Sequence, residues 1–127
     1  MRSKSAYLIV LACLFSHEVD AAFRHEWRVL PLTSFMPEDA GRETFIWAHV
    51  PLFAGLLLGG ERRAVRASVA VFSIAHVGLH WIYRNHPANE FNTLSSWLLI
   101  LGAGLSGALY LLLARRDGAA PPDHPQS

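Results

Sequence analysis

The chain has 127 residues, which is enough for one domain. It is 52% hydrophobic and only 17% charged, and its formal net charge of +1 lacks the basic excess of nucleic-acid-binding proteins, so we expect no nucleic-acid partner. One cysteine excludes an internal disulfide and a cysteine-only zinc cluster, whereas seven histidines are an unusually large number for this length.

The first apolar segment predicts a helix over residues 6–25, which starts as AYLIVLACLF and continues through the more polar SHEVDAAF. It reaches the length of about 17–25 residues that crosses a bilayer only if His17, Glu18 and Asp20 lie inside the bilayer or at its edge. The alternative is a signal peptide with the basic start MRSKS and cleavage near Ala21. We favour a retained helix, since it gives an even number of crossings and keeps the polar residues at the membrane.

Three further apolar segments predict helices over 44–60, 65–83 and 94–114. Their apolar residues are continuous rather than alternating, and each segment is long enough to cross a hydrocarbon core. The one long connection, over 26–43, carries apolar side chains and is expected to lie on the membrane surface. The Pro- and Gly-rich segment 117–127 is typical of a disordered tail.

These segments predict an all-α fold, an integral membrane four-helix bundle of up-and-down topology formed by residues 1–116. More Lys and Arg residues flank the side that holds the N-terminus, so we expect both termini in the cytoplasm and the chain in a bacterial inner membrane. Small residues four apart would let helices approach closely at Gly55 and Gly59 and at Ala103 and Gly107. An aromatic belt is expected at the outer boundary from Trp27, Trp47, Trp81 and Trp97.

Histidines and carboxylates gather in the predicted outer half of the bundle. His76 and His80 are four residues apart on one helix face, the spacing by which a helix supplies two imidazoles to one metal ion. Ionisable residues inside a membrane usually face the bundle interior. The predicted metal ligands are His17, Asp20, His49, His76 and His80. Mixed imidazole and carboxylate ligands favour zinc or iron.

A structural interpretation of these residues stays open beside the metal site. His76 and His80 would then hydrogen-bond across helices and fix their packing. Glu26, Glu43 and Glu90 are expected to be surface groups that pair with neighbouring arginines.

The segments SHEVDAAFRHEWRVLP, HVPLF and HVGLHWIYRNHPANEFN carry a resemblance over residues 6–114. The chain resembles a family of small bacterial multi-pass membrane proteins of unassigned function with HExxA…HEW, HVP and HxxxH motifs. The resemblance implies a membrane location and supplies no activity. The HxxxH of His76 and His80, with His86 downstream, is also similar to one histidine box of the di-iron membrane fatty-acid hydroxylases, but the further HxxHH-type boxes are missing from this sequence.

Three functions are compatible with this pattern. The first is a metal-dependent hydrolase or oxidase of a hydrophobic substrate, in which Glu18 is the general base that polarises a metal-bound water. The alternative is a non-catalytic accessory or scaffold subunit whose polar layer fixes helix packing. The third is a haem-binding bundle with His49 and His76 as axial ligands. Membrane lipid is the expected partner, and the sequence leaves open a homo-oligomer or a partner membrane subunit.

Overall fold

The computed structural model describes residues 1–119, and these residues form helices without any strand. The all-α prediction is therefore confirmed for the described part of the chain. The elements in chain order are α1 (Ser3–Phe23), the short 3-10 helix η1 (Glu26–Arg28), α2 (Glu38–Gly59), α3 (Arg63–Tyr83) and α4 (Leu94–Ala119).

Each helix extends beyond one end of its predicted range: α1 and α3 begin two or three residues early, at Ser3 and Arg63, and α2 and α4 differ most. α2 begins at Glu38 instead of residue 44, because Pro37 precedes it and the carboxylates of Glu38 and Asp39 suit the positive end of a helix. Much of the predicted surface connection is therefore helical. α4 continues past residue 114 to Ala119, and the rest of the predicted tail, 120–127, lies outside the described residues.

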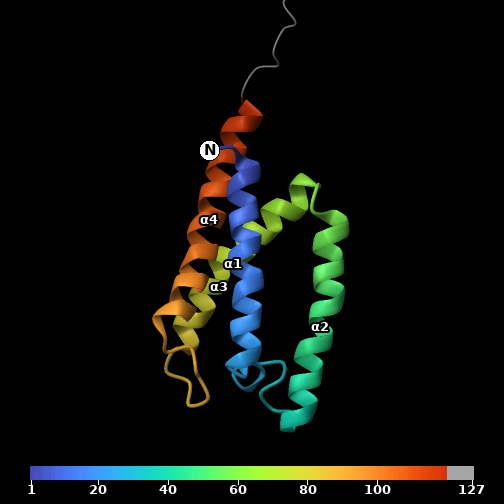
Figure 1. The fold of residues 1–127 in the computed structure, drawn as a ribbon, viewed down its shortest axis with the longest axis vertical. Helices are drawn as coiled ribbons and strands as arrows, with labels where there is room; N and C mark the ends of the chain where they lie inside the picture. The colour runs from blue at the N-terminus through green and yellow to red at the C-terminus, as the bar shows by residue number, and fades with distance from the viewer. Residues whose placement is uncertain (120–127) are drawn as a thin grey trace, which may run out of the picture.

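α1, α3 and α4 pack together, whereas α2 stands to one side (Figure 1). α1 lies along α4 and α3 crosses α4, while α2 packs mainly against η1. The four helices thus form a three-helix core with a flanking helix, instead of four equivalent neighbours.

Glycines allow the close approach of α3 and α4. A Cβ atom at Gly107 would lie 2.8 Å from the carbonyl oxygen of Ala70, and one at Gly104 would lie 2.5 Å from Cγ2 of Val77. Ala103 is fully buried, so the small pair in α4 does lie in a packed interior. At Gly55 in α2, by contrast, a Cβ would meet nothing within 4 Å.

Three helices are long and apolar enough to cross a membrane, namely α1, α3 and α4. α2 falls short because Arg42, Glu43, His49 and Pro51 interrupt its apolar sequence. Large apolar side chains are nevertheless exposed on the outer faces of the helices, with Leu105 72% exposed. Exposed apolar surface on this scale suits a hydrocarbon environment.

Two apolar clusters form the core, with a polar layer between them. The first gathers near the N-terminal end of α1 and comprises Ala6, Tyr7, Val10, Leu14, Val69, Ala70, Ala103 and Tyr110. The second lies near η1 and comprises Ala21, Trp27, Phe45, Phe91 and Ile100. The buried polar side chains at the boundary include His17, His76 and His80.

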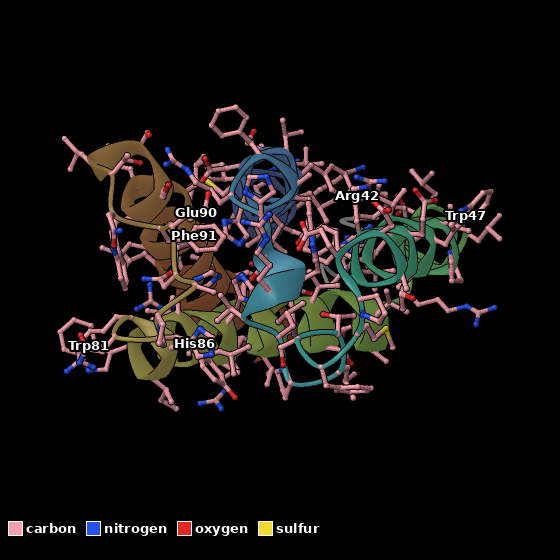
Figure 2. All side chains as sticks on the ribbon, turned by 90° about the horizontal axis from the view of Figure 1, so that it is seen from below. Arg42, Trp47, Trp81, His86, Glu90 and Phe91 are labelled. Atoms are coloured by element: carbon pink, nitrogen blue, oxygen red, sulfur yellow. The ribbon has the colours of Figure 1, made fainter. Side chains whose placement is uncertain are left out.

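One of the four tryptophans departs from the expected aromatic belt. Trp27 is buried and donates its indole N–H to Glu38 Oε1 at 3.1 Å, so the prediction that it lies at the lipid boundary is wrong. Trp47 and Trp81 are exposed and lie on opposite sides of the molecule when it is viewed from the η1 end (Figure 2). Trp27 is buried because the segment after α1 folds back against α2.

Candidate metal centre

Four buried side chains converge between α1, η1 and α3. The Nε2 atom of His80 lies 3.1 Å from Nε2 of His76, 3.2 Å from Nε2 of His17 and 3.3 Å from Oε1 of Glu26. One ligand atom from each of the four residues lies within 4.8 Å of the ligand atoms of the others. His80 is thus the centre of a three-histidine, one-carboxylate cluster.

Local structure explains how each of the four side chains is positioned in the cluster. His76 and His80 are one turn apart on α3, so both side chains leave the same face. His17 is 0% exposed on the facing side of α1. Glu26 follows His25, whose left-handed backbone (φ 52°) reverses the chain after α1 and brings η1 back under the helix ends.

The interpretation of Glu26 as a surface group is wrong, because this side chain is buried beside His80. Sequence reasoning missed it since a glutamate just beyond a helix and close to Arg24 and Arg28 is typical of a solvated turn. The available signal was the repeated His-Glu pair, at His17 and again at His25.

The hydrogen bonds available within the neutral cluster do not satisfy all of its polar atoms. A neutral imidazole has one N–H donor and one acceptor nitrogen. Nε2 of His80 lies within hydrogen-bond distance of three polar atoms, although it can donate or accept only one such bond, and the Nδ1 atoms of His17 and His76 are buried without a partner. A metal ion would accept a lone pair from all three Nε2 atoms and from the carboxylate.

The distances from His80 to the other three atoms match those between ligands of a tetrahedral ion. Zinc binds imidazole nitrogen at about 2.0–2.1 Å, which places the ligand atoms of a tetrahedron about 3.3 Å apart. The three distances from His80 are 3.1–3.3 Å. Burial raises the pKa of the Glu26 carboxyl, but the hydrogen bond to His80 and the nearby imidazoles together lower it by more. The pKa therefore lies below its ordinary value, and Glu26 is present as a carboxylate.

The remaining predicted site residues lie outside this cluster. His49 Nε2 pairs with Glu18 Oε2 at 2.7 Å between α1 and α2, because α2 flanks the core rather than entering it. Asp20 binds Arg24 Nε at 3.2 Å through Oδ1, while its Oδ2 is buried without a partner. His49 and His76, the residues considered for haem, therefore belong to different environments.

Polar contacts at the η1 end of the molecule hold Glu26 in place. Glu90 accepts hydrogen bonds from His25 Nδ1 at 3.0 Å and from Arg28 Nη1 at 3.4 Å, which ties η1 to the loop between α3 and α4. Figure 2 shows Glu90 and Phe91 on that loop, beside the end of α1. The Phe91 ring is buried, with its centroid 4.6 Å from that of His80.

Little free space remains beside the cluster. A cavity of about 10 Å³ touches Glu26, His80 and Phe91, and this volume is just enough for one water molecule. The arrangement can therefore enclose an ion, but it leaves no room for a substrate in this conformation.

Neither a curated protein nor a solved structure matches the chain. One protein family does match, over residues 3–117, and the match includes all four residues of the cluster. The chain therefore belongs to the family of unknown function DUF6713.

Proposed function

We propose that this protein is a multi-pass membrane protein that binds one divalent transition-metal ion, zinc rather than iron, through His17, Glu26, His76 and His80. The observation that carries the proposal is the convergence of three Nε2 atoms and one carboxylate oxygen around His80. A set of four imidazole and carboxylate ligands is typical of zinc.

The closed geometry favours a structural role for the ion over catalysis. Catalytic zinc sites keep one coordination position open, whereas structural sites fill all four with protein ligands. Here Glu26 supplies a fourth ligand, and the adjoining cavity holds one water at most. Glu18, proposed from sequence as a general base, pairs with His49 instead of reaching the cluster. The proposed role of the ion is to join α1, η1 and α3 in an accessory or scaffold subunit.

The proposed topology has four crossings of a bacterial plasma membrane, with both termini in the cytoplasm. Successive helices in Figure 1 run in alternating directions, and α1, α3 and α4 are apolar enough to cross. Arg62, Arg63 and Arg66 lie at the end opposite the metal cluster, where the positive-inside rule favours the cytoplasm. α2 would be the fourth crossing, and the metal centre would lie near the outer face.

Metal analysis of the purified full chain tests the metal site. The protein is loaded with zinc in detergent, freed of excess ion, and its metal content is measured by mass spectrometry. We expect one zinc per chain, strong loss of zinc in His80→Ala and His76→Ala, and an unchanged content in His86→Ala, whose histidine lies outside the cluster. An unmutated, folded protein without stoichiometric zinc would overturn the proposal.

A further inference from the structure

A small polar pocket lies at the end of the molecule opposite the metal cluster, where α1 and α3 begin and α4 ends. Figure 1 shows the N-terminus beside the end of α4. The pocket has a volume of about 260 Å³, below the range of about 300–1,000 Å³ that is common for drug-sized ligands, so it suits a small polar group. Its lining residues are Ser3, Glu61, Arg63, Arg66, Tyr110, Ala114 and Asp117.

Two of the four charged side chains in the pocket already compensate each other. Arg66 Nη2 donates to Glu61 Oε2 at 2.6 Å, and Arg66 Nε donates to the carbonyl oxygen of Gly60 at 2.6 Å. The guanidinium also lies over the Tyr7 ring, with Cζ 5.5 Å from the ring centroid. These contacts fix Arg66 in the wall of the pocket and leave no net charge on its pair with Glu61.

The charges that remain belong to Arg63 and Asp117, and each has a neutral partner. Arg63 Nη2 donates to the carbonyl oxygen of Ala114 at 3.1 Å, and Asp117 Oδ2 accepts a hydrogen bond from Ser3 Oγ. A guanidinium has five N–H groups and a carboxylate has about four lone-pair positions, so these two bonds use a small part of what is available. The pocket therefore offers one cation and one anion to a ligand.

The helix ends place a partial charge of the same sign beside each of these groups. Arg63 is the first residue of α3, whose N-cap residue makes no side-chain cap, so the free N–H groups there carry a partial positive charge. Asp117 lies in the last turn of α4, beside carbonyl groups with a partial negative charge. A carboxylate is unfavourable at that end of a helix, and a cationic group bound to it would relieve the repulsion.

The position of the pocket limits the source of such a ligand. The apolar part of α4 ends at Asp117, so in the proposed topology the pocket lies where hydrocarbon meets the lipid head groups. A phosphate ester with a primary ammonium carries both of the required charges. Its phosphate can accept two parallel N–H bonds from Arg63, and its ammonium can donate to Oδ1 of Asp117.

We propose that this pocket binds the phosphoethanolamine head group of a phospholipid, with the phosphate on Arg63 and the ammonium on Asp117. The inference rests on the proposed membrane crossing. It does not depend on the metal ion, because none of the four cluster residues lines the pocket.

Native mass spectrometry of the full chain in detergent tests the site. The protein is titrated with phosphatidylethanolamine, phosphatidylcholine and phosphatidylglycerol of the same acyl chains. Phosphatidylcholine keeps both charges but has no ammonium N–H, and phosphatidylglycerol has the phosphate without an ammonium. We expect the first phosphatidylethanolamine to bind about tenfold more tightly than either, the size of effect that one charge-assisted hydrogen bond gives. Soluble phosphoethanolamine should bind far more weakly, because it buries no acyl chain.

Substitutions at the two charged groups separate the contributions of phosphate and ammonium. Asp117→Asn should weaken phosphatidylethanolamine binding about tenfold and leave phosphatidylcholine binding unchanged. Arg63→Gln should weaken the binding of both lipids alike. The matched controls are Asp39→Asn, at an exposed position on α2, and Arg116→Gln, at an exposed position on α4 that does not line the pocket. Neither control should change the affinity for phosphatidylethanolamine.

Three results would overturn the proposal: equal binding of phosphatidylethanolamine and phosphatidylcholine, tighter binding of phosphatidylglycerol, or equal losses in Arg63→Gln and Arg116→Gln. The last two would indicate a general attraction of anionic groups to the arginines at this end. Circular dichroism reports whether each variant is folded, and if Arg63→Gln is not, the lipid preference and Asp117→Asn decide. Extraction of the chain from membranes without detergent would refute the proposed membrane location, whereas a lost lipid preference in a detergent-requiring chain refutes this site alone.

Discussion

His17 and Glu18 are neighbours on α1, yet they belong to two regions of different construction. His17 points into the buried interior between α1 and α3, where two further imidazoles and Glu26 enclose it. Glu18 lies on the side of α1 that faces α2, where a groove separates the two helices. The comparison teaches that adjacent residues of one helix can have very different surroundings: several buried partners enclose His17, whereas Glu18 has a single partner beside free space.

The largest effect is expected from the loss of His80, the residue at the centre of the proposed metal cluster. His80→Ala should remove zinc and lower the free energy of unfolding by at least about 4 kcal/mol, the stabilisation that a ligand gives at a thousand times its Kd. Thermal unfolding in detergent, with and without a chelator, measures this effect. His49→Ala is the matched variant on the groove side and should leave both zinc content and chelator sensitivity unchanged.

Packing density itself can be tested with glycine substitutions. Gly107→Ala should cost up to about 3 kcal/mol, because the new methyl group meets the backbone of Ala70 and the side chain of Ser73. Gly55→Ala, where the space is open, should be neutral or stabilising by up to about 1 kcal/mol through helix propensity. Equal effects of the two substitutions on the unfolding midpoint would contradict the difference between the close packing of α4 with α3 and the open space around Gly55 of α2.

Asp20 offers a smaller, positioning effect. Its Oδ2 and the Nδ1 of His17 are both buried without partners, and the residues share one face of α1. A carboxylate commonly orients a metal-bound imidazole through its second nitrogen. We predict that Asp20→Asn weakens zinc affinity about tenfold. Competition with a chromophoric chelator measures the affinity, and an unchanged value would limit Asp20 to its ion pair with Arg24.

The smallest effect is expected at Glu90, which ties η1 to the α3–α4 loop. Its contacts with His25 and Arg28 are part-exposed, so Glu90→Gln should cost less than about 1 kcal/mol of stability. Because η1 carries Glu26, zinc should dissociate a few times faster from the variant. Stopped-flow transfer of zinc to a chelator measures the rate, and Glu43→Gln, at an exposed position on α2, is the control.

Sequence spacing was sufficient to predict which side chains share a helix face when those residues belong to one helix. The interval between His76 and His80 places both on one face, and the polar His17 within an apolar helix indicates that it faces inward. Spacing could not identify Glu26, whose burial depends on the left-handed turn at His25 and on coverage by Phe91. It also could not separate His49 from the cluster, because equal depth along two helices does not show which helices are neighbours.

The sequence by itself determined that the chain is helical, that its long apolar segments suit a membrane, and that His76 and His80 lie on one helix face. These properties follow from local periodicity and composition. Only the tertiary structure decided that α2 flanks a three-helix core, that η1 returns beneath it, and that Glu26 completes the cluster while Glu18 and His49 line a groove. Such pairings join residues far apart along the chain, so they depend on how helix surfaces fit together and not on any local pattern.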